Sequence, residues 1–326
     1  MRYFDGVVEL GKTDVYSDGF GMEWGLDRSW TNGAGYATST FSGSGMVVSE
    51  LPYIMQDGTA NHVAVITNGI DSRDFDLSGG VYSPRFYQQE GLAHDLPNSQ
   101  FVLTDTTGQV LRFWDFSTGL PVNERGQFQS LADPAGNVTQ VTSRTTDGKP
   151  AEVQRTATSA GQTVTESFQY SYLTSGPDTG LMSGVTLRRQ VNGGAWTVTR
   201  QSVLSYYDGT QSFGNVGDLQ LASITDGAGH TLDTTYYRYY SGEAGGYSHA
   251  LKYVIGPESY ARLAAALGNP LTLSDSQISG YADRFFQYAK WAPPFRLTPG
   301  KGFFADEQSG PRIGFEPTTR GLTAAC

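Results

Sequence analysis

Hydrophobic and polar residues alternate along most of this chain, in short runs separated by turn-forming residues. The stretch from 205 to 240 shows the pattern best, because β-branched and aromatic runs alternate there with clusters of Asp, Gly and Asn. A period of two residues is typical of strands that have one buried face. The pattern predicts strands joined in an antiparallel meander, with further runs at 110–116, 138–143, 166–172, 182–190 and 196–206.

A repeated turn motif, Asp-x-x-Gly, separates several of these runs. Asp suits the first position of a type I turn, since its carboxylate accepts hydrogen bonds from the backbone ahead, and Gly accepts the left-handed conformation that follows. Such a turn leads one strand into the next with a one-residue bulge. We expect positive φ at Gly136 and Gly229, and structural turns at Asp105 and Gly108, Asp133 and Gly136, and Asp226 and Gly229.

Two further features accompany these turns: a Tyr-Asp pair at Tyr207 and Asp208, and an Asp-x-x-Gly-Asn sequence at 133–137. With these features the chain resembles the Rhs-type or YD-repeat proteins, best between 126 and 253. The segments 19–24 and 29–33 are similar to the segment that opens such repeat regions. That family comprises large bacterial surface or secreted proteins. The resemblance implies a mainly β fold, a long antiparallel β-meander or spiralling sheet of degenerate YD-type hairpin repeats.

The chain divides by pattern into four parts. Residues 1–125 form a β-rich region before the repeats, and 126–255 form the repeat-like antiparallel sheet. Residues 256–288 have a helical pattern and are interpreted as an insertion that packs on the sheet; the alternative is a lid or an arm that binds a partner. The part at 289–326 has no period and five prolines. We expect it to be a disordered or non-homologous tail that protease removes.

The helical insertion near the C-terminus is expected to contain two helices. An alanine-rich run at 257–267 begins with proline and is followed by Gly268, which is typical of a short helix. A second helix is predicted at 274–288, with Ser274 as its N-cap. Because the strand pattern stops near 255, we expect the last strand edge to stay unpaired and to promote association through the C-terminal edge of the sheet.

Charge and cysteine content exclude several classes of protein. The net charge of -10 argues against nucleic-acid binding. The single cysteine, Cys326, allows no intrachain disulfide. No run approaches the roughly 18 apolar residues of a membrane span, and the first residues lack the apolar core of a signal peptide. A cytoplasmic protein and an internal piece of a longer exported chain are the alternatives. We favour the interpretation that the chain is an internal piece of a longer exported protein. The family resemblance implies an extracellular or cell-envelope location.

Aromatic residues near the N-terminus are the candidates for ligand binding. Trp24, Trp30 and Tyr36 are close together in sequence, and they would offer a stacking surface for carbohydrate if they were exposed. They would instead form the core of a small β layer if they were buried. We favour the core interpretation, because tryptophan is usually largely buried.

No motif for a metal, a cofactor or a catalytic set stands out. Asp71, Asp74 and Asp76 lack the spacing of a calcium loop, and the four histidines show no ligand spacing. We expect a non-enzymatic structural segment of an Rhs or YD-repeat cell-surface or secreted protein. Its partners would be neighbouring repeats of the same parent protein or a second copy at a sheet edge. The alternatives are a carbohydrate-binding β module and a β-fold hydrolase whose carboxylates converge in space.

Overall fold

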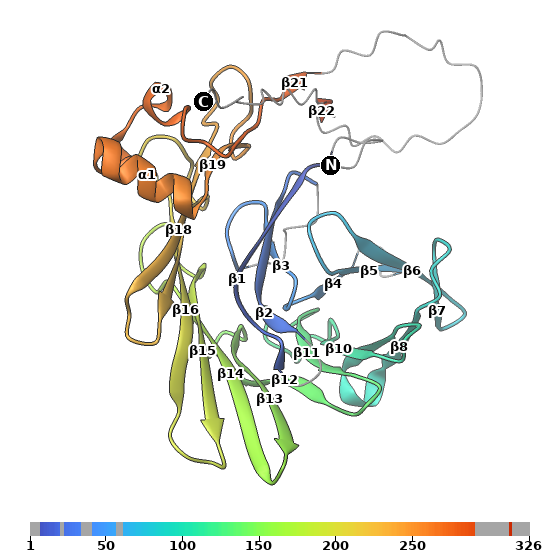
Figure 1. The fold of residues 1–326 in the computed structure, drawn as a ribbon. Coiled ribbons are helices and arrows are strands. Elements are labelled where there is room, and N and C mark those ends of the chain that lie inside the picture. The colour runs from blue at the N-terminus through green and yellow to red at the C-terminus, as the bar shows by residue number, and fades with distance from the viewer. Residues whose placement is uncertain (1–6, 20–22, 34–40, 57–60, 291–312, 315–326) are drawn as a thin grey trace, which may run out of the picture.

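The computed structural model describes residues 7–19, 23–33, 41–56, 61–290 and 313–314 of the chain. The protein is mainly β, and its ladders between named strands are antiparallel, as the alternation predicts. Two small sheets come first in the sequence, followed by a long one (Figure 1).

In each of the two small sheets, the strands lie side by side in the order in which they occur in the sequence: β1-β2-β3 in the first and β4-β5-β6-β7 in the second. The first sheet is called here the N-terminal sheet. The strands are β1 (Glu9–Ser17), β2 (Trp24–Thr31), β3 (Met46–Val48), β4 (Tyr53–Gln56), β5 (His62–Ile66), β6 (Ser72–Ser78) and β7 (Val81–Pro84).

Thirteen strands of the described residues form one sheet, the long sheet, in which each strand pairs with its neighbours in sequence. Short turns favour this order, because they bring consecutive strands side by side. The sheet starts at 91 and ends at 285, so it extends on both sides beyond the range 126–255 expected for the repeats. Its strands are β8 (Gly91–Asp95), β9 (Gln100–Thr104), β10 (Val110–Trp114), β11 (Phe128–Ala132), β12 (Val138–Arg144), β13 (Pro150–Ser159), β14 (Gln162–Tyr172), β15 (Met182–Val191), β16 (Thr197–Tyr206), β17 (Leu219–Asp226), β18 (Thr231–Tyr239), β19 (Leu251–Ile255) and β20 (Arg284–Phe285).

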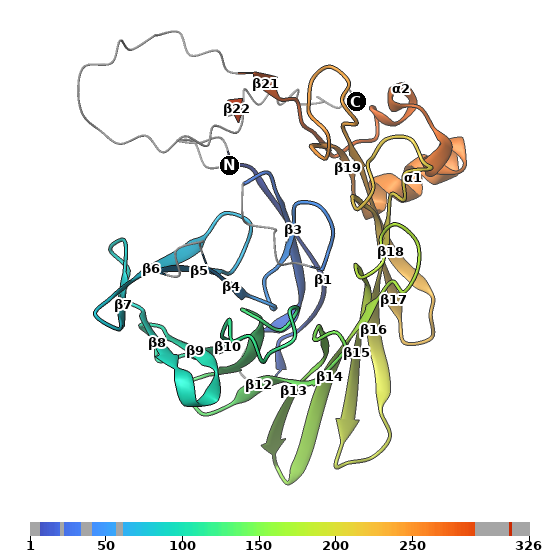
Figure 2. The ribbon, with the colours of Figure 1, turned by 180° about the vertical axis from the view of Figure 1, so that it is seen from behind.

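The later strands curve around the N-terminal sheet. In Figures 1 and 2, β4–β7 and the long sheet form an arc, and β1–β3 lie inside it. Hydrogen bonds between distant segments hold this arrangement, for example from Ser44 N to Gly217 O at 2.8 Å and from Ile54 N to Gly126 O at 2.7 Å. The concave face of the long sheet therefore faces the N-terminal sheet.

The main hydrophobic core fills the space between these two sheets. Trp24 and Trp30 of β2 are 4% and 2% exposed and belong to the same cluster as Phe168 and Tyr170 of β14. The ring of Trp24 lies 5.5 Å from that of Phe128. The core interpretation of the two tryptophans therefore holds, and Tyr36 lies outside the described residues.

The Asp-x-x-Gly turns have the geometry that their sequence requires. The φ angles of Gly136 and Gly229 are +86° and +88°. In the turn between β17 and β18, the Asp226 carboxylate accepts hydrogen bonds from the backbone of Ala228 and His230, each at 2.9 Å. In all three turns the backbone N–H of the glycine donates to the carbonyl of the aspartate, at 3.2 Å for Gly108 and Asp105, 3.0 Å for Gly136 and Asp133, and 3.1 Å for Gly229 and Asp226.

The helical part is shorter than its sequence predicts. The first helix, α1 (Pro257–Leu267), has the expected bounds, and two 3₁₀ turns, η2 (Leu96–Asn98) and η3 (Pro270–Thr272), are also present. The second helix was predicted to reach residue 288, but α2 (Asp275–Ile278) is a single turn. The prediction is wrong for 279–288 because β20 pairs there with β19, so tertiary pairing overrides the local preference.

The same segment changes the expectation for the last strand edge. The backbone N–H groups of Asp283 and Phe286 donate to the carbonyls of Val254 and Lys252, both at 2.9 Å. The edge of β19, which the sequence was expected to leave open, is therefore covered, and the sheet ends in the two-residue β20. Of the tail at 289–326, the described residues comprise only β21 (Ala289–Lys290) and β22 (Ile313–Gly314), which pair with each other.

The turn geometry can be tested by comparing two glycines at which an added Cβ has room, one with positive φ and one without. A Cβ added at Gly229 or at Gly91 would meet no atom within 4 Å, but only Gly229 has positive φ. We expect Gly229→Ala to lower the free energy of unfolding by about 1–2 kcal/mol. Gly91→Ala should not destabilise, since alanine loses less conformational entropy on folding. Equal losses in urea unfolding would contradict the turn assignment.

Candidate functional site between the N-terminal sheet and the long sheet

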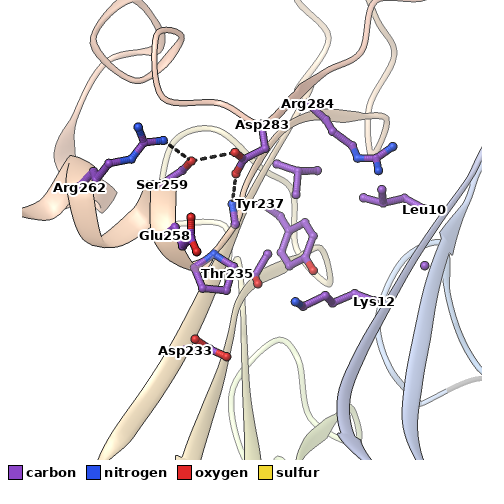
Figure 3. A pocket seen from close by; sticks show the side chains of 14 residues that line it. Leu10, Lys12, Asp233, Thr235, Tyr237, Glu258, Ser259, Arg262, Asp283 and Arg284 are labelled. Atoms are coloured by element: carbon purple, nitrogen blue, oxygen red, sulfur yellow. Dashed lines mark hydrogen bonds between the residues drawn. The ribbon is translucent and has the colours of Figure 1, made fainter.

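A pocket of about 560 Å³ lies where β1 approaches β18 and the start of α1. Figure 3 shows side chains from these separate elements around it. The lining residues are Leu10, Gly11, Lys12, Asp233, Thr235, Tyr237, Val254, Gly256, Pro257, Glu258, Ser259, Arg262, Asp283 and Arg284. The pocket thus combines charged groups of both signs with a buried tyrosine.

One wall of the pocket is the capped start of α1. The first backbone N–H groups of a helix attract an anion, and here the Asp283 carboxylate takes that place. It accepts hydrogen bonds from Gly256 N at 2.5 Å and from the Ser259 hydroxyl at 2.7 Å. Arg262 in turn donates to the Ser259 oxygen at 3.0 Å (Figure 3). The helix start is therefore already occupied by a side chain of the protein.

The charged groups that remain are of both signs. Lys12 and Arg284 are the cations, and Asp233 and Glu258 are the anions; none of the four has an ion pair with another described residue. Neither histidine nor cysteine lines the pocket. The Ser259 hydroxyl donates to the Asp283 carboxylate and accepts from the Arg262 guanidinium, so it connects both charged groups to the start of α1.

Behind the pocket, a buried ion pair connects four strands. Arg28 of β2 donates from Nε to Asp14 Oδ2 at 2.5 Å and from Nη2 to Asp14 Oδ1 at 2.8 Å, a bidentate pair in which both side chains are 1% exposed. Ser202 of β16 donates to the same carboxylate at 3.1 Å. Arg28 also donates to the hydroxyl of Tyr237 of β18 at 3.3 Å.

The pKa of Arg28 favours its charged state. Burial opposes the charge of Arg28, but Asp14 and Tyr237 raise its pKa above the ordinary value. Burial raises the pKa of Tyr237, so its hydroxyl stays protonated. The group is thus a guanidinium–carboxylate pair within the N-terminal sheet, hydrogen-bonded to two strands of the long sheet.

A second buried charge forms a similar connection further along β1. Glu166 of β14 is fully buried and accepts from Ser17 of β1 at 2.7 Å and from Arg155 of β13 at 2.9 Å. Arg189 of β15 also pairs with Glu166. Although burial opposes the negative charge, these hydrogen bonds hold the pKa of Glu166 below its usual value.

Glu50 is a third acidic group in this region, and its environment is different. Its carboxylate accepts one hydrogen bond from the Asp27 backbone N–H at 2.8 Å. Burial raises the pKa of Glu50 to about 8, because the backbone hydrogen bonds to its carboxylate lower the pKa by less than the lost hydration raises it. The group is therefore largely protonated at neutral pH in the folded protein.

The structure separates the residues that the sequence singled out. Trp24 and Trp30 lie in the core and cannot stack on a sugar. The six turn residues lie at hairpin ends, and none of them lines the pocket. Asp74 and Asp76 of the rejected calcium loop are paired with His62 and Arg85. Sequence reasoning missed the pocket residues, since single charged residues in four elements give no signal.

The described residues contain no group of three or more potential ligands that could hold a metal ion. Each of the four histidines instead lies within 3.1 Å of an aspartate. Within the described part of the chain, no helix is long and apolar enough to cross a membrane.

No protein-family model matches the chain, and no curated protein matches it. Two solved structures resemble it. One is the N-terminal domain of the effector protein SpvB from Salmonella typhimurium strain LT2, with 14% identity and a TM-score of 0.41 over 67% of this chain and 99% of that one. The other is the Tc holotoxin pore of Photorhabdus luminescens, with 10% identity and a TM-score of 0.42 over 72% of this chain and 16% of that one. At these identities the likeness transfers no function.

The buried ion pair can be tested by removing one charge. Asp14→Asn would leave the Arg28 guanidinium buried without its counter-charge, and we expect a loss of about 3–5 kcal/mol in the free energy of unfolding. Asp76→Asn breaks an aspartate–arginine pair whose side chains are 46% and 40% exposed, so its effect should be much smaller. Urea unfolding of both variants gives the comparison. Similar losses would show that Arg28 does not depend on Asp14.

The raised pKa of Glu50 predicts a pH dependence of stability. Between its ordinary value of 4.5 and about 8, the folded state holds a proton on Glu50 that the unfolded state has released. Stability should therefore fall as pH rises through this window, by at most about 1.4 kcal/mol per pH unit from this group. Burial also raises the pKa of Asp218, so the test compares the wild type with Glu50→Gln. The variant should show a flatter stability profile from pH 5 to pH 8, and an unchanged slope would contradict the assignment.

Proposed function

We propose that this chain is a non-enzymatic structural segment of an Rhs-type or YD-repeat protein, contributing to a β shell. The observation that carries the proposal is the long sheet itself. Thirteen described strands follow one another in sequence order and curve around the N-terminal sheet. A long meander can surround a space with hairpin turns alone, without a crossover connection. This geometry suits the wall of a shell.

The Asp-x-x-Gly hairpins support the same proposal. Three such turns, beginning at Asp105, Asp133 and Asp226, connect consecutive strands of the long sheet. The Tyr-Asp pair at 207–208 follows β16, and the Tyr207 ring is fully buried with its hydroxyl donating to Tyr237 O at 2.8 Å. In this reading the motif residues are structural: the aspartates form turns and the tyrosine fills the core.

The location and partners follow from that proposal. A shell segment of this family would act outside the cell or at the cell envelope, and its partners would be neighbouring repeats of the same parent protein. Trp24 and Trp30 are buried, which removes these two residues as candidates for stacking on a carbohydrate. Asp283 is engaged by the start of α1, so the hydrolase alternative would have to use Asp233 and Glu258, the other carboxylates that line the pocket.

The test is to co-express this chain with the protein segments that are encoded beside it. If it is part of a shell, co-expression with adjacent repeat segments should yield a stable complex in which backbone amides of β8 or β20 exchange more slowly than in the chain alone. Turnover of model glycosides, esters or peptides by the purified chain, abolished by Asp233→Asn or Glu258→Gln, would overturn the non-enzymatic assignment. Adjacent segments without strand patterns would overturn the shell assignment.

A further inference from the structure

The unpaired charges of the pocket between β1, β18 and α1 are separated by sign. Figure 3 shows Lys12 pointing from β1 into the pocket, with Asp233 of β18 and Glu258 of α1 on the opposite side. Arg284 of β20, a second cation, also lines the pocket. None of these four side chains has an ion pair with another described residue. Opposite charges that face one another across a cavity without contact are free to pair with a ligand that lies between them.

A buried hydroxyl lies between the two signs of charge. Thr235 of β18 is 4% exposed and lines the pocket, and Figure 3 places it between Lys12 and the two carboxylates. Its side chain has no hydrogen bond to another described residue. Buried polar groups of proteins are normally hydrogen-bonded. A ligand with a donor or an acceptor at this point would therefore pair with a group that the surrounding protein leaves free.

The main chain of an edge strand also borders the pocket. β1 forms a ladder with β2 alone, so its other edge carries no strand of the described chain. Residues 10–12 of β1 line the pocket, and a Cβ added at Gly11 would meet no atom within 4 Å. An extended peptide can add to such an edge through main-chain hydrogen bonds. This edge favours a peptide over a ligand without amide groups.

The size and the rigidity of the pocket suit a short ligand. Its volume of about 560 Å³ lies within the roughly 300–1,000 Å³ of small-molecule sites. The Asp283 carboxylate holds the start of α1 through Gly256 N and the Ser259 hydroxyl. Glu258 lies between these two residues, so its backbone is fixed before a ligand binds. A wall that is already ordered reduces the entropy that binding costs.

We propose that this pocket binds a short peptide that carries a negative charge at one end and a positive charge at the other. The carboxylate of the peptide lies towards Lys12 and Arg284, and its ammonium group lies towards Asp233 and Glu258. Thr235 bonds to the peptide between these ends. A ligand with charge of one sign only would be repelled by one of the two pairs. The proposal does not depend on the shell function.

The experiment measures the binding of trialanine to the purified chain by isothermal titration calorimetry. Four forms of the peptide are compared: both termini free, N-acetylated, C-amidated, and blocked at both ends. We expect the form with both termini free to bind best. Blocking one terminus should raise the dissociation constant about threefold to tenfold, because each terminus makes charge-assisted hydrogen bonds in the pocket. Blocking both should weaken binding further.

Two double variants locate the ends of the peptide. K12Q/R284Q should weaken binding of the free and the N-acetylated peptide, which keep the carboxylate, and should not weaken binding of the C-amidated peptide. D233N/E258Q should show the opposite pattern, with weaker binding of the free and the C-amidated peptide only. Thermal melts check that both variants are folded, which we expect because these side chains have no ion pair to lose.

The matched control is R112Q/R200Q, which removes two positive charges from arginines that do not line the pocket. It should bind every form of the peptide as the wild type does. The proposal is overturned by a wild type that binds none of the four forms at millimolar concentration, or that binds the free and the doubly blocked forms equally. It is also overturned if a singly blocked form binds best, or if K12Q/R284Q and the control lose affinity equally.

Discussion

The contact between the N-terminal sheet and the long sheet is organised around the buried ion pair between Arg28 and Asp14, both of which belong to the N-terminal sheet. Both charges are removed from water, and an unpaired buried charge costs several kcal/mol. Ser202 and Tyr237 complete the hydrogen bonding from two strands of the long sheet. These two hydrogen bonds connect the charged pair of one sheet to the other sheet. A slip between the sheets would leave Arg28 and Asp14 paired with each other but would remove both of these hydrogen bonds.

The features that depend on residues close together in the sequence, namely strands and turns, could be predicted. Alternation located most strands of the long sheet, and Asp-x-x-Gly located turns whose glycines have the expected φ. Residues 279–288 were predicted wrongly because local preference was followed. Gly280 inside the predicted helix was a signal against it, and the pairing of Arg284 and Phe285 with β19 is a tertiary effect.

The candidate site could not be predicted, because it is formed by distant residues. Ser17 and Glu166 are separated by 149 positions, and Arg28 and Tyr237 by 209. Alternation shows that a strand has a buried face, but it does not show which other element of the fold that face packs against. Lys12 has the appearance of an ordinary strand residue until β18 and α1 are placed beside it.

The abundance of tyrosine has a physical reason in this fold. A curved sheet needs large side chains to fill its concave side, yet its strand ends leave carbonyl groups without ladder partners. Tyrosine meets both needs, since the ring packs and the hydroxyl donates. Five tyrosine hydroxyls donate to backbone carbonyls at 2.7–2.9 Å, those of Tyr172, Tyr206, Tyr207, Tyr240 and Tyr288. Phenylalanine at these positions would fill the same space but leave the carbonyls unpaired. These hydroxyls connect residues that are 22 to 46 positions apart in sequence, so each tyrosine both fills space with its ring and joins two segments of the fold.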